Sequence, residues 1–241
     1  MHPLFKAALV GALVLTACGG DDPANDDGKK STAAATAAGA DALVLHQEYT
    51  MGVGGYMYAT WNPYLLYADG SIYRNLATSP DKLDPAASKV AEPKSWGTYA
   101  KSGGLGDLVV TWSDGEAESW AKGDWQPATP GKPGLELNGE WTTISGGGNT
   151  AFGGDVVTVS SGYLAFQGNR FTSERGGGGM TSNVTTYASE DKAGTYSIDG
   201  YTLTLTYDDG KVVKEFFYLY SDEDSDVFGV GDDAYVIKRE D

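Results

Sequence analysis

The stretch Tyr201-Thr202-Leu203-Thr204-Leu205-Thr206-Tyr207 decides the fold of this chain. Threonine alternates with leucine or tyrosine throughout, which is the period-2 pattern of an antiparallel strand with one buried face and one solvent face. A slip of one residue would exchange the two faces, so the pattern also fixes the orientation. We therefore predict that Tyr201, Leu203, Leu205 and Tyr207 point inward and that the three threonines point outward.

Asp-Gly pairs punctuate the chain at Asp69-Gly70, Asp114-Gly115, Asp199-Gly200 and Asp209-Gly210. Such a pair between two apolar runs predicts a hairpin with a type I′ turn, because glycine accepts a positive φ. Glycine supplies 34 of 241 residues, about twice its usual share of ~7%. Together with abundant Tyr and Trp, this indicates many short strands joined by tight turns. The predicted fold class is all-β, built from antiparallel meanders.

A weak internal repeat predicts two related units. Three matches occur in the same order: 64–67 with 163–166, Gly97-Thr98-Tyr99 with Gly194-Thr195-Tyr196, and 109–115 with 204–210. We expect each Gly-Thr-Tyr triplet to start a strand that pairs with the strand ending at the next Asp-Gly turn. Trp112 should then lie opposite Tyr99, as Tyr207 lies opposite Tyr196. The first β unit is assigned to residues 43–125 and the second to 137–241, and a Pro- and Gly-rich linker or extended crossing, 126–136, lies between them.

The N-terminus has the order of parts of a secretory signal peptide. Lys6 is followed by an apolar stretch from Ala7 to Leu15, which is too short to span about 30 Å of hydrocarbon as a helix. The run Leu15-Thr16-Ala17-Cys18 then resembles the lipobox of bacterial lipoproteins. The resemblance implies that residues 1–17 are a signal peptide, that the chain is cut before Cys18, and that diacylglycerol is attached to the Cys18 thiol. Gly19 implies, by the same resemblance, the outer rather than the inner membrane of the envelope.

Residues 18–42 are interpreted as the lipidated cysteine and a disordered tether. Positions 19–42 contain no aromatic and no large aliphatic residue, so they cannot bury a core. At about 5–6 Å × √n, the mean reach of such a tether is roughly 25–30 Å.

Gly139 and Trp141 form a Gly-x-Trp motif that resembles the start of small lipocalin-like barrels, with 234–237 as a closing strand. The resemblance implies that the second unit is a small lipocalin-like barrel. The whole chain also resembles uncharacterised bacterial lipoproteins that carry a Gly-Gly-Gly-Asn-Thr segment, here 146–150. That likeness implies no activity.

Composition excludes several function classes. The formal net charge of -16 disfavours nucleic acid and bare anionic lipid as partners. The mature chain has no cysteine besides Cys18, so it can form no disulfide. Its one histidine, His46, lies on the polar phase of the first strand, and we interpret it as solvated rather than catalytic. Zinc needs several His or Cys ligands, so neither a metal nor a cofactor is predicted.

An enzyme would have to work with carboxylates alone, held about 5–9.5 Å apart in a cleft. Glu116 and Glu118 share a strand face beside Trp120, and Asp124 precedes Trp125, but we interpret all three as surface charge. A weak calcium candidate comprises Asp222, Asp224 and Asp226. An EF-hand would need glycine where Val227 stands, so a solvated hairpin tip is the preferred interpretation. The glycine runs 146–150 and 176–179 are expected to be loops at the barrel mouth.

The favoured hypothesis is a non-enzymatic, lipid-anchored envelope protein that binds a small apolar ligand, a glycan or a protein partner through loops at the barrel mouth. The alternatives are a structural or assembly component without a ligand, and a carboxylate-only hydrolase. A pocket lined by Trp and Tyr would favour binding. A solid core with an exposed apolar patch would favour assembly. Two converging carboxylates in a cleft would favour hydrolysis. The six tryptophans are expected to fill the cores rather than to stack on sugar rings.

Overall fold

The computed structural model describes residues 37–51, 57–102, 107–148, 157–181, 184–220 and 226–239. The first sheet contains β1 (Ala42–Met51), β2 (Met57–Leu66), β3 (Ser71–Tyr73), β4 (Trp96–Ser102), β5 (Asp107–Trp112), β6 (Ala117–Trp120) and β7 (Trp125–Pro127). The second contains β8 (Gly139–Gly148), β9 (Val157–Gln167), β10 (Arg170–Met180), β11 (Thr185–Asp199), β12 (Thr202–Tyr207), β13 (Val212–Leu219), β14 (Val227–Val230) and β15 (Asp233–Ile237). Among the described residues, a short helix, α1 (Pro85–Ala91), and two 3₁₀ turns, η1 (Ala37–Gly39) and η3 (Pro93–Ser95), accompany the strands.

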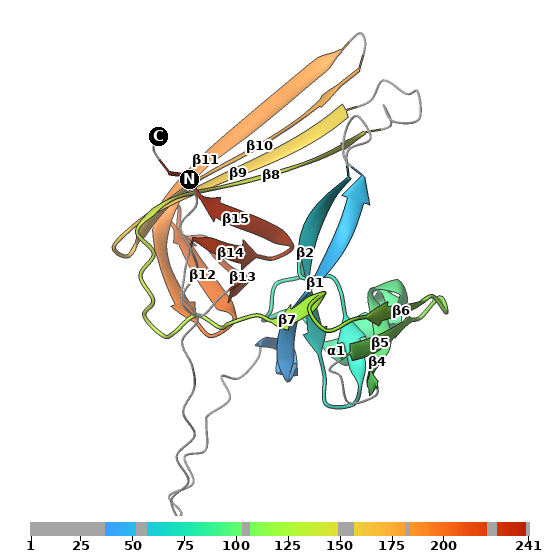
Figure 1. Cartoon of the computed structure of the whole chain (residues 1–241). Coiled ribbons are helices and arrows are strands. Elements are labelled where there is room, and N and C mark those ends of the chain that lie inside the picture. Colours follow the sequence, from blue (N-terminus) through green and yellow to red (C-terminus); the bar gives the residue numbers. More distant parts are fainter. Residues whose placement is uncertain are drawn as a thin grey trace, which may run out of the picture. The chain divides into compact units, whose positions relative to one another are not determined.

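All pairings between named strands are antiparallel (Figure 1). The first sheet has the order β6-β5-β4-β3-β2-β1-β7, and the second closes into a barrel in the order β10-β11-β12-β13-β14-β15-β8-β9. The predicted all-β fold with two related units, the second a small barrel, is confirmed. Within the described ranges, no helix is both long and apolar enough to cross a membrane.

The two sheets contain the same six-strand meander, β1 to β6 and β8 to β13. One row of facing residues crosses each meander from its first to its fifth strand. In the first unit the row is Ala42, Leu66, Ile72, Gly97 and Trp112. In the barrel it is Gly139, Phe166, Phe171, Gly194 and Tyr207. Each Gly-Thr-Tyr triplet therefore pairs with the strand that ends at the next Asp-Gly turn, as the repeat predicted.

Three details of the predicted repeat are wrong. Gly194-Thr195-Tyr196 does not start its strand, because β11 begins at Thr185. Trp112 and Tyr207 lie opposite Gly97 and Gly194, two residues before the tyrosines that were expected there. The β2–β3 connection is also longer than the β9–β10 connection. For that reason the counterpart of Tyr64 is the inward residue 164 of the barrel and not Tyr163.

Glycine is required in both rows because neighbouring groups occupy the space of a side chain. A Cβ atom at Gly97 would lie 2.6 Å from the Thr111 carbonyl oxygen and 2.9 Å from the Trp112 ring. At Gly194 it would lie 2.1 Å from the Thr206 carbonyl oxygen. The glycine lets the large aromatic residue across the strand pair pack over the backbone, which fixes the register of each meander.

Three of the Asp-Gly turns share one geometry. In each, the glycine N–H donates to the carbonyl of an aromatic residue three positions earlier, at 2.9 Å from Tyr67, Trp112 and Tyr207. The aspartate side chain accepts the N–H two residues later, at 2.9–3.1 Å. Only the glycines have positive φ, from 79° to 90°. The turns are therefore not type I′, which would need positive φ at the aspartate too; the aspartate carboxylate closes the turn instead.

The burial pattern predicted for residues 201–207 is confirmed with one change. Leu203 and Leu205 belong to the barrel core, Tyr207 is partly buried against it, and none of the three threonines is buried. Tyr201 is buried but precedes the strand, and it packs outside the barrel, where its hydroxyl donates to the Ala128 carbonyl at 2.8 Å.

The outer face of the barrel and one face of the first sheet share an apolar cluster. Phe216 and Tyr218 of β13 join Leu43 and Leu45 of β1 in that cluster, and all four are fully buried. The opposite face of the first sheet, called the inner face below, surrounds a separate cluster: Val44, Tyr64, Leu66, Ile72, Leu108, Val110, Trp112 and Trp120. Residues 43–46 of β1 and 63–66 of β2 are therefore buried on both faces, whereas the described side chains in the other halves of these strands are partly or fully exposed.

Segment 126–136 is an ordered crossing. Ala128 donates to the Leu43 carbonyl, and Thr129 exchanges hydrogen bonds with Leu219, so this segment is bonded to both sheets. The end of the predicted tether is also packed: Ala40 is 3% exposed. The rest of that tether, the signal peptide and Cys18 lie outside the described residues.

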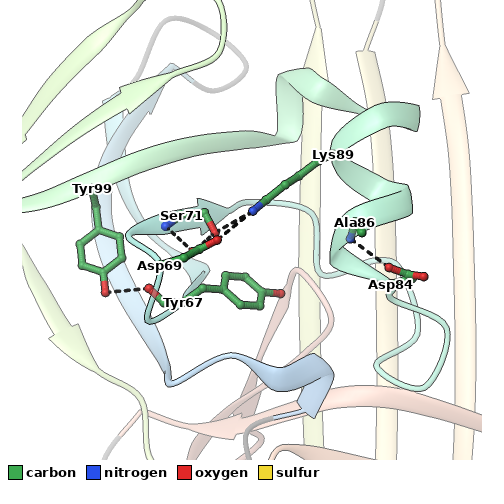
Figure 2. Close-up of polar contacts among 7 residues, drawn as sticks. All are labelled: Tyr67, Asp69, Ser71, Asp84, Ala86, Lys89 and Tyr99. Atoms are coloured by element: carbon green, nitrogen blue, oxygen red, sulfur yellow. Dashed lines mark hydrogen bonds and ion pairs between the residues drawn. The ribbon is translucent and has the colours of Figure 1, made fainter.

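Polar contacts attach α1 to the β2–β3 turn (Figure 2). Asp84 caps α1 by accepting the N–H groups of Ala86 and Ala87. Lys89 in the last turn donates to Asp69 at 3.2 Å. Hydrogen bonds from Ser71 and from Lys89 lower the pKa of Asp69 to about 2.

The glycine runs were predicted as loops, and this is wrong for their described parts. Residues 146–148 belong to β8, and Gly176–Gly179 belong to β10. They pair in register with β9, and these regular backbone hydrogen bonds hold the glycines extended.

We predict that Leu205→Ala lowers the free energy of unfolding by about 2–5 kcal/mol, because it opens a cavity in the barrel core. Thr204→Ser, on the opposite face of the same strand, should cost well under that. Denaturant unfolding of both variants measures the difference. Equal losses would show that both faces of β12 are buried.

Candidate functional site

Polar side chains continue the inner face of the first sheet beyond its apolar cluster. On β1, His46 and Glu48 follow Val44 at the same alternate positions, and Asn62 lies opposite His46 on β2. We define the inner-face cluster as His46, Glu48, Asn62, Tyr64, Arg74 and Glu118. Adjacent strands of one meander supply most of its members, and Glu118 arrives from β6 because the sheet curls.

Glu48 is the centre of the hydrogen bonds at this end of the sheet. The Tyr64 hydroxyl donates to its carboxylate, and His46 Nδ1 lies 3.5 Å from its Oε1 atom. Burial alone would raise the pKa of Glu48, but the nearby His46 and Asn62 side chains and the hydrogen bond from Tyr64 outweigh burial and lower it. Burial and the adjacent Glu48 carboxylate raise the pKa of Tyr64. At neutral pH this pair is therefore a carboxylate acceptor and a protonated phenol donor.

Glu118 holds the two indoles beneath the cluster. Its carboxylate accepts the Nε1–H of Trp112 at 2.7 Å and that of Trp120 at 2.9 Å. The Arg74 guanidinium lies 4.1 Å from the centre of the Trp112 ring. His46 stacks on Trp120 at 4.0 Å, with 11° between the ring planes. Aromatic side chains thus position Glu118, Arg74 and His46.

A pocket of about 260 Å³ opens over this cluster. Glu48, Asn62, Pro63, Tyr64, Arg74 and Asp232 line it. Asp232 comes from the β14–β15 turn of the barrel and is held in place by the Leu76 N–H, which donates to its Oδ1 atom at 2.9 Å. The pocket therefore combines acceptors, donors and one cation in a small volume, which is the composition of a polar ligand site.

The barrel lacks this cluster although its meander has the same register. The residues that stand at the positions of Asn62, Tyr64 and Glu118 are Gly162, Leu164 and Val213. Thr143 stands where the first unit has His46. The polar groups are therefore not needed to build the meander, and they distinguish the first unit from its repeat.

The barrel interior is filled rather than hollow along its apolar part. Its buried core includes Trp141, Phe166, Phe217 and Phe228, and aromatic rings there contact one another at 5.4–6.2 Å. Of the six tryptophans, Trp96, Trp112, Trp120 and Trp141 are at most 4% exposed. The expectation that tryptophans fill the cores is confirmed for these four.

The prediction that His46 is solvated is wrong. It was expected on a solvated face, but it is 8% exposed, because both faces of β1 are covered over residues 43–46. Glu116 and Asp124 are exposed, while Glu118 belongs to the inner-face cluster. Asp222 and Asp224 lie outside the described residues, and Asp226 is paired with Arg239. In the described ranges, no three His, Cys, Asp or Glu side chains gather closely enough to hold a metal ion.

Glu48, Asn62, Tyr64, Arg74 and Asp232 were not identified from the sequence. One signal was available: Val44, His46 and Glu48 alternate in phase, so a buried Val44 places the other two on the same face. Asp232 had no such signal, because it reaches the pocket from another sheet. Compared with known proteins, the chain matches no family model, no curated protein sequence and no solved structure.

The lowered pKa of Glu48 predicts a specific pH dependence. A carboxyl group whose folded pKa is below its unfolded value of about 4.3 contributes stability that is full above that pH and is lost as pH falls through the folded pKa. Glu48→Gln should therefore be less stable than the wild type at neutral pH, with a difference that shrinks below about pH 4.3. Urea unfolding from pH 3 to 7 measures this. Glu116→Gln is the matched exposed control, and the same pH trend in that variant would contradict the assignment.

Proposed function

We propose that this chain is a non-enzymatic, lipid-anchored envelope protein that binds a hydroxyl-rich small ligand, one sugar unit of a glycan, in the pocket over the inner-face cluster. The observation that carries the proposal is the pocket itself, with Glu48, Asn62, Arg74 and Asp232 converging on about 260 Å³. That volume lies just below the range of about 300–1,000 Å³ for ligand sites, so it suits a ligand of one ring.

The donor and acceptor set favours hydroxyl groups over an apolar ligand. Carboxylate oxygens of Glu48 and Asp232 accept from hydroxyls, and the Arg74 guanidinium donates to them. Bonds to ionised groups are about twice as strong as neutral ones and fix the orientation of a ligand. An apolar ligand would remove water from these groups without replacing its hydrogen bonds, at a cost of about 1–3 kcal/mol for each group left unsatisfied. The filled barrel core also argues against an apolar ligand inside the barrel.

The same groups favour binding over hydrolysis. General acid–base catalysis works best with a group that titrates near the operating pH. The pKa of Glu48 is lowered and that of Tyr64 is raised, so both are moved away from neutrality. Glu118 is occupied by two indole N–H groups. His46, the one histidine among the described residues, does not line the pocket.

The envelope location rests on the sequence. Leu15-Thr16-Ala17-Cys18 resembles a lipobox, and the following residues suit a tether. A lipid on Cys18 would hold the folded part near a membrane, which the resemblance at Gly19 implies is the outer one. A structural or assembly role is the second candidate, and the apolar side chains exposed on β8 to β10 favour it: Ile144 is 77% and Met180 49% exposed.

The binding proposal predicts that neutral mono- and disaccharides change the tryptophan fluorescence of the full chain, because Trp112 and Trp120 lie directly under the pocket. Titration calorimetry with the sugars that respond gives the affinity. Glu48→Gln and Asn62→Ala should each weaken binding about 5- to 100-fold, the loss of one or two hydrogen bonds to a charged or polar partner.

Glu116→Gln is the matched control. Glu116 is an exposed glutamate in the turn between β5 and β6, and this variant should bind like the wild type. Binding that survives both pocket substitutions would contradict the pocket assignment. Release of reducing sugar during the titration would contradict the non-enzymatic role and favour hydrolysis.

A further inference from the structure

Four barrel strands extend beyond their neighbours. β8 pairs with β15 only at Trp141 and Thr142, and β11 pairs with β12 only from Gly194 onward. The remaining parts of β8 to β11 stay paired with one another and continue together past the shorter strands (Figure 1). We call this four-stranded extension the wing, residues 143–148, 157–163, 173–180 and 185–193.

The wing has an open edge on β8. Among the strands that the structure describes, none pairs with the outer side of β8 from Thr143 to Gly148. The edge of a sheet presents unpaired N–H and C=O groups, and natural proteins protect such edges with charges, proline or bulges. Residues 143–148 read Thr-Ile-Ser-Gly-Gly-Gly, with neither charge nor proline. This edge is therefore left available for pairing with another strand.

Charge is absent from the β8 and β9 parts of the wing although the chain is strongly acidic; the charged residues of the wing, Glu174, Arg175, Glu190, Asp191 and Lys192, lie on β10 and β11. Residues 142–163 contain one charged residue, Asp155, and residues 176–189 contain none, against a net charge of -16 for the chain. Ile144, Val159 and Met180 of the wing are 77%, 41% and 49% exposed. Two copies of such an acidic chain repel one another through most of their surfaces. Two copies can approach one another at the uncharged β8 edge of the wing without this repulsion.

The open edge selects a protein strand over lipid as the partner. Unpaired backbone groups cannot face hydrocarbon, where each costs several kcal/mol. The other wing edge, on β11, carries Glu190 and Asp191, which would place like charges together in a β11–β11 pair.

We propose that the chain forms a two-fold symmetric dimer in which residues 143–148 of β8 pair antiparallel with the same residues of a second copy. Such pairing joins the two wings into one continuous sheet and uses the open edge of each copy. Because the contact is the same on both partners, it closes at two chains. The dimer is independent of the sugar pocket, which lies on the first sheet.

A cysteine scan tests this in membranes of bacteria that make the full chain. Each residue from 143 to 148 is replaced singly by cysteine, and the membranes are treated with a mild oxidant. The yield of disulfide-linked dimer should be highest at one or two neighbouring positions and lower on both sides of them. The reason is that antiparallel self-pairing brings only one point of the strand to the symmetry axis. The wild-type chain shows any contribution from Cys18.

Val90→Cys is the matched control, because Val90 on α1 is 83% exposed and lies outside the wing. It should stay monomeric. Adding Ile144→Lys to the best cysteine variant should lower the dimer yield severalfold, with unchanged circular dichroism. Val90→Lys in the same background should not. The proposal would be overturned if none of the six cysteine variants gave a dimer, or if Val90→Cys gave an equal yield. It would also be overturned if lipid alone protected the cysteines from a soluble maleimide.

Discussion

The burial on both faces of residues 43–46 of β1, 63–66 of β2 and 216–219 of β13 is the constraint on which the rest of the structure depends. A sheet that is covered on both faces reads as a continuous apolar run rather than as an alternating one. Leu43-Val44-Leu45, Tyr64-Leu65-Leu66-Tyr67 and Phe216-Phe217-Tyr218-Leu219 are such runs, and each contributes to two clusters. The first sheet has one face against the barrel and the other around its own core. The two units therefore share one apolar contact that neither can satisfy alone.

This arrangement places a polar cluster at one end of the inner face of the first sheet. The face of the first sheet that meets the barrel is closed by Phe216 and Tyr218, and the barrel interior is filled. The inner face runs from apolar residues into the inner-face cluster, and the β14–β15 turn supplies Asp232 to its pocket. The chain contains the same meander twice. Only the first has a glutamate, a tyrosine and an asparagine (Glu118, Tyr64 and Asn62) at positions where the barrel has small or apolar residues. In our account, the barrel acts as a support and the first unit as the binding element.

Period and turn residues predicted the antiparallel meanders, because both signals are local. The two related units were predicted from the internal repeat, and the closed second unit from the resemblance of Gly139 and Trp141 to the start of lipocalin-like barrels. His46 was misplaced for a physical reason: period-2 reasoning assigns one face to water, but both faces of β1 are covered over residues 43–46. The apolar run at Leu43 already contained that information. Glu118 and Asp232 depend on curvature of the sheet and on docking of a second sheet, and neither leaves a signal within a few residues of the sequence.

The most direct test of the shared contact is hydrogen exchange, followed by mass spectrometry, on the Phe216→Ala variant. Phe216 lies on the outer side of the barrel and is fully buried against the first sheet. The account predicts that protection falls in β1 and β2, including the segments with Glu48 and Tyr64, as well as in β13. Loss of protection confined to β13, with β1 and β2 unchanged, would contradict the claim that the barrel supports the binding element.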